Sequence, residues 1–276
     1  MRLILHLSDT HFGTERPTVV EALTRLTQRE RPDIAVLSGD VTQRARRAQF
    51  AAARQFVQGL GVPDVITLPG NHDIPLDNVL ARLRHPYARY LEAFEGPLSR
   101  VYRGPGELIV ALNTTRWYRH IQGTVSRRQL QWSCDELRAA PPGRLKLVVT
   151  HHPVYVPRSS EERNLLRGHR EAVAQWAAAG ADLILGGHIH LPSIAPLAVP
   201  LTLTRSVWSV QAGTAVSCRV RWEAPNSVNL LRYDPLVAPG ECRAERWDFN
   251  AASDEFVLAE TVQMLLAGRE SPAAGR

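Results

Sequence analysis

Six short apolar runs recur through the first two thirds of the chain, and they limit the folds that it can adopt. The runs are residues 3–7, 34–37, 65–68, 108–112, 145–149 and 183–185. Each is continuous and rich in Val, Ile and Leu, as expected for strands that are covered on both faces. Segments with helical spacing alternate with them, at residues 17–29, 45–60, 126–139 and 165–179. This alternation predicts an α/β fold with a largely parallel sheet.

The remaining third of the chain has a different pattern. Strand-like segments separated by Pro and Gly turns lie at residues 194–204, 208–212, 217–222, 227–233 and 242–249. We therefore expect residues 190–250 to form a strand-rich, antiparallel second sheet and residues 252–266 to form a C-terminal helix. Residues 268–276 are expected to be a frayed tail. The length of 276 residues suits one large domain, which we place at residues 1–267.

The composition is that of a globular protein, with 44% hydrophobic and 22% charged residues. No apolar run reaches the roughly 18–20 residues that span a bilayer, and the N-terminus reads as a strand and not as a signal peptide.

Three cysteines without CxxC spacing favour free thiols in a reducing compartment, so we expect a cytoplasmic protein. A net charge of +6 and a pI of about 9.7 favour anionic partners, although an arginine-rich surface alone gives the same values.

Asp, Asn or His residues follow five of the six apolar runs. The segments are Ser8-Asp9-Thr10-His11, Ser38-Gly39-Asp40, Gly70-Asn71-His72-Asp73, Thr150-His151-His152 and Gly187-His188-Ile189-His190. The carboxyl ends of parallel strands lie side by side, and ligands of open α/β folds bind in the crevice outside them. We therefore expect these side chains to converge at one edge of the sheet.

Carboxylate, amide and imidazole ligands without a thiolate suit divalent ions such as Mn²⁺, Fe²⁺ and Zn²⁺. The candidates are too many for one tetrahedral ion. Two ions about 3.5–4 Å apart, bridged by a carboxylate, would bind a phosphate oxygen and make hydroxide available at neutral pH. Taken singly, Asp9 could cap a turn and His11 could be a buried, hydrogen-bonded ring. The five segments together favour the metal site.

The same segments resemble, in order, the motif set of the calcineurin-like metallophosphoesterases. The matching pieces are Asp9-x-His11, Gly39-Asp40, Gly70-Asn71-His72-Asp73, His151 and Gly187-His188-x-His190. The resemblance covers residues 9–190 and implies a four-layer α/β/β/α sandwich with a dinuclear metal centre. The pieces 151–153, 211–215 and 226–230 are most similar to the class III cyclic-nucleotide phosphodiesterases.

The resemblance also implies a role for each residue. One metal ion would be held by Asp9, His11, Asp40 and His190, and the other by Asp40, Asn71, His151 and His188. His72 would contact the phosphate and protonate the leaving oxygen, and Asp73 would orient His72 from behind. The ligands accept Mn²⁺, Fe²⁺ or Fe³⁺, and Zn²⁺. Related UDP-diacylglucosamine hydrolases usually have Arg at the position of His72, which argues against that lipid substrate.

These features predict a hydrolase that cleaves a small-molecule phosphodiester by attack of a metal-activated hydroxide on phosphorus. The class III resemblance makes 3′,5′-cyclic AMP the candidate substrate. A nuclease or a broad-specificity phosphatase with the same centre is the first alternative, although no nucleic-acid-binding module is recognisable. A scaffold without activity is the second, and the intact ligand set argues against it. By analogy with relatives, the C-terminal strands and helix could form a homodimer interface.

Several nearby residues have more than one interpretation. His152 has either a role beside the metal site or a side chain that points away from it, and His6 is expected to be a core residue. Arg44, Arg46 and Arg47 either recognise an anionic substrate or form a solvated helix face, and we favour the face.

Two further segments are candidates for the substrate site. The basic-aromatic alternation at residues 219–222 fits either stacking on a base or a half-exposed strand. Trp117, Tyr118 and His120 follow an apolar run and could form a wall of the site.

Overall fold

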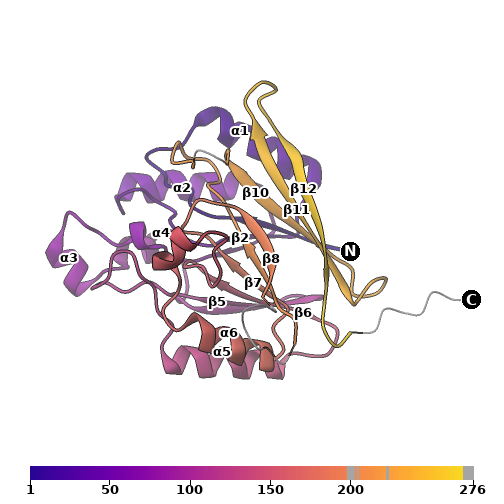
Figure 1. Cartoon of the computed structure of the whole chain (residues 1–276). Coiled ribbons are helices and arrows are strands. Elements are labelled where there is room, and N and C mark those ends of the chain that lie inside the picture. Colours follow the sequence, from indigo (N-terminus) through magenta and orange to yellow (C-terminus); the bar gives the residue numbers. More distant parts are fainter. Residues whose placement is uncertain (198–202, 204, 222–223, 270–276) are drawn as a thin grey trace, which may run out of the picture.

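Two six-stranded sheets pack face to face between two layers of helices in the computed structural model, which describes residues 1–197, 203, 205–221 and 224–269 (Figure 1). We call the sheet with strand order β12-β11-β10-β1-β2-β3 sheet I and the sheet with order β4-β5-β6-β7-β9-β8 sheet II. Sheet I consists of β1 (Arg2–Leu7), β2 (Ile34–Leu37), β3 (Asp64–Thr67), β10 (Ser227–Tyr233), β11 (Glu241–Asn250) and β12 (Glu255–Leu265). Sheet II consists of β4 (Arg100–Arg103), β5 (Glu107–Leu112), β6 (Leu145–Thr150), β7 (Leu183–Gly186), β8 (Ser193–Pro196) and β9 (Trp208–Gln211).

Each sheet has a parallel part that carries the predicted strands. In sheet I, β1, β2 and β3 run parallel, and in sheet II, β5, β6, β7 and β9 do so. Antiparallel strands extend both sheets, with β10 next to β1 and β4 next to β5. All six predicted apolar strands are confirmed, with ends that differ by at most one residue.

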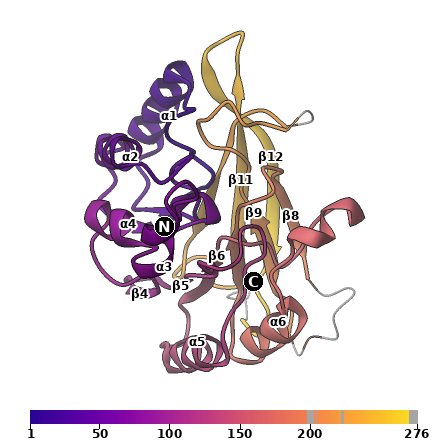
Figure 2. The same ribbon diagram turned by 90° about the vertical axis from the view of Figure 1, so that its left-hand side faces the viewer.

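Helices cover the two outer faces of the sandwich. Helices α1 (Pro17–Glu30) and α2 (Arg47–Gly59) lie on sheet I, and α5 (Arg127–Ala139) and α6 (His169–Ala178) lie on sheet II (Figures 1 and 2). All four helices were predicted. Pro17 opens α1, and the Ser126 side chain caps α5 by accepting a hydrogen bond from the Gln129 N–H. The short helices α3 (Val79–Arg84) and α4 (Ala88–Ala93) were not predicted.

Three apolar layers hold the four layers of the sandwich together. In β1, Leu3, Leu5 and Leu7 pack towards α1 and α2, whereas Ile4 packs between the sheets. On the other side of sheet II, Val148 and Ile184 pack towards α5 and α6. Each central strand therefore buries both faces, which explains the continuous apolar runs. The predicted α/β/β/α sandwich is confirmed.

The prediction of a helix over residues 252–266 is wrong, because most of these residues form β12, an eleven-residue strand paired with β11. Arg246 pairs with Glu260 and Trp247 with Leu258, so Ala259 is an extra residue, a β-bulge. The bulge breaks the two-residue alternation that identifies a strand in a sequence, and the apolar residues then fall at spacings that resemble a helix.

The expectation that residues 190–250 form a separate antiparallel sheet is also wrong. β8 and β9 extend sheet II, with β9 parallel to β7, whereas β10 and β11 extend sheet I from the edge of β1. Strands added at these edges satisfy backbone groups that would otherwise be unpaired. The predicted strand at residues 217–222 is absent over residues 217–221, and residue 222 lies outside the described residues. Residues 198–202 and 204 of the predicted strand 194–204, and residues 270–276 of the predicted tail, also lie outside them.

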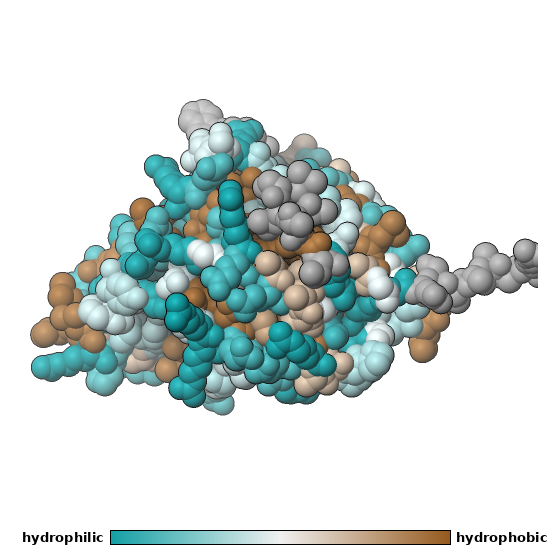
Figure 3. All heavy atoms as spheres, turned by 60° about the horizontal axis from the view of Figure 1, so that its bottom comes forward, coloured by the Kyte–Doolittle hydropathy of each residue, from teal (hydrophilic) through white to brown (hydrophobic). Residues whose placement is uncertain are grey.

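One end of the molecule carries exposed apolar side chains. Val79, Leu80 and Leu83 of α3 are more than half exposed, and Figure 3 shows apolar atoms gathered at that end, on the left. Within the described part of the chain, no helix has both the length and the apolar character needed to cross a membrane.

The strand assignment of β12 predicts that substitution of one residue destabilises the fold strongly and that substitution of its neighbour does not. Met264 is fully buried between the sheets, whereas Leu265 is 66% exposed. We expect Met264→Ala to lower the free energy of unfolding by about 2–5 kcal/mol, because it leaves a cavity in a packed layer. Leu265→Ala is the matched control and should change it by less than about 0.5 kcal/mol. Urea unfolding measures both, and equal losses would contradict the alternation.

Candidate metal centre

The predicted ligands come from both sheets, which corrects the expectation of a single sheet edge. Asp9, His11, Asp40 and Asn71 follow strands of sheet I, and His151, His188 and His190 follow strands of sheet II. Hydrogen bonds join the two edges: His151 Nδ1 donates to the Ser38 carbonyl at 2.9 Å, and the His188 N–H donates to Asp9 Oδ2 at 2.9 Å. All seven side chains meet at this junction.

A first group of ligand atoms surrounds a small volume beside Asp9. His11 Nε2 lies 3.7 Å from Asp9 Oδ1, 3.7 Å from Asp40 Oδ2 and 3.3 Å from His190 Nε2. His190 Nε2 lies 3.5 Å from Asp9 Oδ1. Atoms that each bind one ion at about 2.0–2.2 Å lie roughly 3–3.6 Å apart, so the group has close to the spacing of a metal site.

A second group lies on the other side of Asp40. His151 Nε2 is 3.4 Å from Asp40 Oδ1 and 3.2 Å from Asn71 Oδ1. His188 is near enough for one of its ring nitrogens to share an ion with Asp40 and His151. The two oxygens of the Asp40 carboxylate therefore face different groups. This is the arrangement that a bridging carboxylate needs.

The protonation pattern shows that these groups fit cations. A carbonyl oxygen can only accept, so the nitrogen that contacts it must be the donor. His151 Nδ1 donates to Ser38, and His190 Nδ1 lies 2.6 Å from the Arg219 carbonyl. In the neutral rings, both Nε2 atoms then point lone pairs at carboxylate oxygens. Asp9 Oδ1 and His188 Nδ1 are also buried without a hydrogen-bond partner among the described residues.

The pKa values of these groups reflect the same demand for positive charge. Burial opposes protonation of His151, but the Asp40 carboxylate outweighs it and raises the pKa of His151 to about 9. Burial likewise raises the pKa of Asp40, yet His151 and His72 reverse the effect and hold it well below its usual value. A metal ion supplies the charge that a proton would otherwise bring.

The backbone is strained where it presents the ligands. Asp9, His11, Asp40, His188 and His190 all have φ between 42° and 76°, a region that residues other than glycine seldom adopt. Five of the eight such non-glycine residues in the described chain are thus candidate ligands. Strained backbone of this kind clusters at functional sites.

Two glycines allow the close approach of the loops. Gly39 has φ of 110°, and a Cβ there would collide with the His151 ring. A Cβ on Gly70 would collide with the backbone and the carboxylate of Asp40. A side chain at either position would push the ligand loops apart.

His72 lies beside both groups, but Asp73 does not orient it as predicted. His72 Nδ1 donates to the Gln43 carbonyl at 3.1 Å, and the His72 N–H donates to Asp40 Oδ1 at 2.8 Å. The Asp73 carboxylate instead accepts from the backbone of residues 41, 42 and 70 and from the hydroxyl of residue 42. Asp73 therefore fixes the loop after β2, and through that loop the carbonyl that holds His72. Burial and the nearby Asp40 raise the pKa of Asp73 to about 6.

The segment after β9 has a role that the sequence did not reveal. Thr214 Oγ1 lies 2.7 Å from His190 Nδ1, which also donates to the Arg219 carbonyl. Asn226 donates to the carbonyls of Thr214 and Ser217 and holds the loop in place. The pieces at residues 211–215 and 226–230 were predicted as markers of a subfamily. In the structure, Thr214 of the first piece contacts the candidate ligand His190, and Asn226 of the second holds the loop.

Arg219 extends from the same loop into the site. Its guanidinium lies 2.9 Å from Gln43 Oε1 and 3.4 Å from His72 Nε2. The segment 219–221 is not a strand, and Arg221 pairs with Glu161 at 2.9 Å. The Arg219 side chain is therefore placed to contact an anion that reaches His72.

His152 is buried beside the metal site, and its ring packs against that of His188 with centroids 4.7 Å apart. Its Nδ1 lies 2.7 Å from Thr114 Oγ1. Of the two interpretations, the role beside the metal site is the one that this geometry supports. His6 is buried and hydrogen-bonded to Ser38, as expected of a core histidine.

A cavity of about 370 Å³ opens above the ligands. Its lining includes Asp40, Asn71, His72, His188, His190 and Arg219, together with His120, Ile121, Arg163, Asn164, Val220 and Arg221. His120 is thus a wall residue, with its ring 5.7 Å from that of His72. Trp117 and Tyr118 do not line this cavity and are 41% and 58% exposed.

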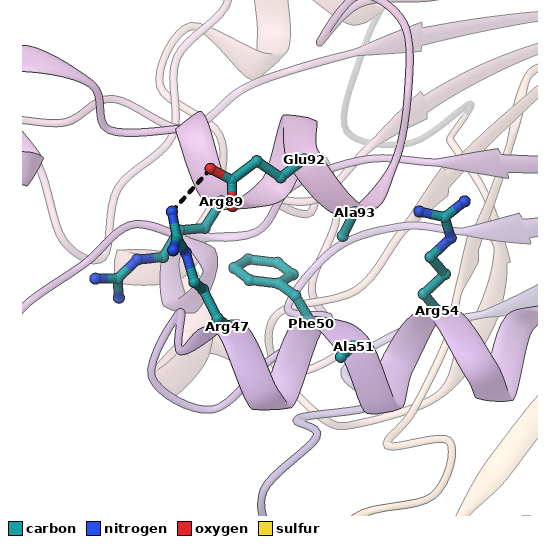
Figure 4. Close-up of a pocket in the computed structure, with 7 residues that line it drawn as sticks. All are labelled: Arg47, Phe50, Ala51, Arg54, Arg89, Glu92 and Ala93. Carbon is teal, nitrogen blue, oxygen red and sulfur yellow. Dashed lines mark hydrogen bonds and ion pairs between the residues drawn. The ribbon is translucent and has the colours of Figure 1, made fainter.

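A larger hollow of about 460 Å³ lies between α2 and α4 (Figure 4). Its lining has no residue in common with the ligand groups, and Arg47 pairs there with Glu92 at 3.1 Å. Arg44, Arg46 and Arg47 are exposed, and none of them lines the cavity above the ligands. This supports the interpretation of the three arginines as a solvated face.

Comparison with known proteins agrees with this geometry. A family model described as calcineurin-like phosphoesterase matches residues 2–192. The chain belongs to the calcineurin-like phosphoesterase family. The predicted resemblance is confirmed. Members of the family use a dinuclear metal centre, and the two ligand groups can bind metal ions.

Curated relatives show weaker similarity. Glycerophosphodiester phosphodiesterase GpdQ of Enterobacter lignolyticus is 37% identical over 84 residues, which are 26% of this chain and 29% of that protein. The 3′,5′-cyclic adenosine monophosphate phosphodiesterase CpdA of Escherichia coli K12 is 26% identical over 199 residues, which are 68% of this chain and 69% of that protein. The matched region thus spans less than a third of the length of GpdQ.

Among solved structures, purple acid phosphatase PPD1 of yellow lupin matches 96% of this chain with a TM-score of 0.73 and 12% sequence identity. The match covers 53% of the lupin chain. This similarity shows a shared fold.

The ligand geometry predicts two metal ions per chain and a stabilising effect of metal. At one hundred times the dissociation constant, each ion that binds only the folded state adds about 2.7 kcal/mol to the free energy of unfolding. We expect Asp40→Asn to lose most of this effect of Mn²⁺, because Asp40 faces both groups. Metal analysis and thermal unfolding with and without chelator measure it.

The exposed Asp135 provides the matched control. Asp135→Asn should retain both ions and the full thermal shift. Equal metal content in Asp40→Asn and the wild type would contradict the bridging arrangement.

Proposed function

We propose that this protein is a dinuclear-metal phosphodiesterase whose catalytic residues lie at the junction of the two sheets. The observation that carries the proposal is the position of Asp40, which directs one carboxylate oxygen at each ligand group. Asp9, His11, Asp40 and His190 would hold one ion, and Asp40, Asn71, His151 and His188 the other. Such ions bind a phosphate oxygen and lower the pKa of water towards about 7.

His72 is the group placed to protonate the leaving oxygen. Its Nδ1 is committed to the Gln43 carbonyl, so Nε2 is the atom that faces the cavity. Burial lowers the pKa of His72, while the nearby Asp40 opposes the shift. The protonated ring is therefore a stronger acid than free imidazole, which suits donation to an alkoxide.

Arg219 is the group placed to stabilise negative charge on the phosphoryl oxygens. Gln43 holds its guanidinium beside His72 Nε2, so both side chains reach the same volume. Negative charge increases on the phosphoryl group in the transition state, and a preorganised cation in a partly buried site stabilises it.

A phosphodiester is the substrate class that the relatives favour. Cleavage of a phosphoric ester, whether monoester or diester, releases an alkoxide that needs a proton, which His72 would supply. The printed names of GpdQ and CpdA describe phosphodiesterases, and CpdA acts on 3′,5′-cyclic AMP. Cyclic AMP is therefore the first natural compound to test. Action on nucleic acid, a homodimer, the identity of the metal and a cytoplasmic location stay predictions.

The first activity prediction concerns His72. We expect His72→Ala to lower kcat for a bis-aryl phosphate and for cyclic AMP by roughly 10²–10⁴-fold, with the metal content unchanged. The loss should be smaller for a diester with a good leaving group, because such a group departs as a stable anion and needs less protonation.

His85→Ala, at an exposed histidine, is the matched control and should retain wild-type kcat. A wild-type kcat in His72→Ala would contradict the proposed function. A clear preference of the wild type for a mono-aryl phosphate over the diesters would also contradict it.

The second activity prediction concerns Arg219. We expect Arg219→Gln to lower kcat/KM for a bis-aryl phosphate by about 10²–10³-fold, as for the loss of one preorganised donor. Arg219→Lys should recover part of the lost activity, because lysine restores the positive charge but not the planar guanidinium that forms two parallel hydrogen bonds. Retention of full activity by Arg219→Gln in steady-state assays would contradict the assignment.

A further inference from the structure

The metal-site cavity continues into a second hollow that is rich in arginine. This outer hollow, of about 500 Å³, is lined by Arg119, His120, Ile121, Gln122, Arg163 and Arg167. His120, Ile121 and Arg163 also line the metal-site cavity, so the two hollows adjoin along these residues. We call the outer hollow the arginine trough.

The arginines of the trough are not neutralised by carboxylates. Arg167 donates to the amide oxygen of Gln122 at 3.2 Å, and Arg119 lies over the Tyr118 ring at 5.6 Å. Arg163 forms no ion pair with another described residue. No Asp or Glu of the described chain lines the trough. Three positive charges thus border a hollow that has room for an anion.

The charges at the metal centre do not account for these arginines. Two divalent ions bring four positive charges, and the buried carboxylates of Asp9, Asp40 and Asp73 bring three negative ones. A hydroxide held by the ions would bring a fourth negative charge, so the site would be neutral before substrate binds. The single negative charge of a phosphodiester, and the additional charge of its transition state, would then be stabilised by Arg219. The trough arginines are left without a counter-charge on a singly charged substrate such as cyclic AMP.

We infer that the preferred substrate is a phosphodiester that carries a second phosphate group, which binds in the arginine trough while the scissile phosphate lies at the metal centre. This inference rests on the proposed function and names the substrate class of the same site. Arginine is suited to the task because its guanidinium binds phosphate through two parallel hydrogen bonds. The trough adjoins the metal-site cavity directly, so a phosphate one nucleotide away from the scissile one is the simplest fit.

Thymidine dinucleotides with and without a 5′-phosphate test this inference. We expect kcat/KM for the 5′-phosphorylated dinucleotide to exceed that for the unphosphorylated one by about tenfold or more, the factor that one charge-assisted contact supplies. In Arg119→Gln/Arg167→Gln, the ratio of the two values should fall to about one. Arg127→Gln/Arg128→Gln, at exposed positions of α5, is the matched control and should keep the ratio.

A binding measurement provides a second result that does not depend on turnover. By calorimetry, the metal-loaded His72→Ala protein, in which slow turnover is expected, should bind the 5′-phosphorylated dinucleotide about tenfold more tightly than the unphosphorylated one. The same protein with Arg119→Gln/Arg167→Gln added should not discriminate. The preference should weaken as salt increases. Circular dichroism verifies that the variants are folded.

The outcomes separate this inference from the proposed function. Hydrolysis of both dinucleotides with equal kcat/KM, and equal binding, would overturn the second-phosphate site and leave the phosphodiesterase intact. Absence of hydrolysis of any diester would overturn the proposed function, and the binding measurement alone would then decide the inference.

Discussion

Two buried carboxylates that face imidazole nitrogens are the constraint on which the rest of the structure depends. Asp9 and Asp40 have almost no contact with solvent, and burial by itself favours their protonated forms. The neighbouring histidines reverse this effect and lower the pKa of both carboxyl groups, so both remain charged. Buried negative charges of this kind require cations. The junction of the sheets is therefore built to bind positive charge, and its stability is linked to metal binding.

The fold holds this arrangement in place by rigid packing on every side. Left-handed backbone at a residue other than glycine costs on the order of 1–3 kcal/mol. Several such residues lie side by side at the ligand loops, directly after central strands whose two faces are buried. Three apolar layers fix those strands, and hydrogen bonds accepted by Asp73 and donated by Asn226 fix the loops beyond them. Strain at the site is thus supported by packing elsewhere.

The chemistry and the selectivity of the site come from different parts of the chain. The ligands follow the strands of the two sheets, and the charges of two metal ions would be balanced by three carboxylates and the attacking hydroxide. The arginines of the trough belong to the loop at residues 116–122 and to the segment at residues 159–167. Loops outside the regular elements tolerate change, so they can select the substrate without altering the metal centre.

The sequence by itself determined the central strands, the four long helices and all seven candidate ligands. Each ligand follows an apolar run within a few residues, so a local pattern located it, and the family resemblance separated it from His72, Asp73 and His152. Only the tertiary structure decided that the ligands come from two sheets, that β12 is a strand interrupted by a bulge, and that Asp73 contacts a loop and not His72. It also decided the positions of Gln43, Thr214 and Arg219 at the site. These contacts join residues that lie far apart in the chain, and packing between layers sets them. Periodicity within a segment carries no information about which sheet edge a strand joins or which side chain reaches a shared cavity.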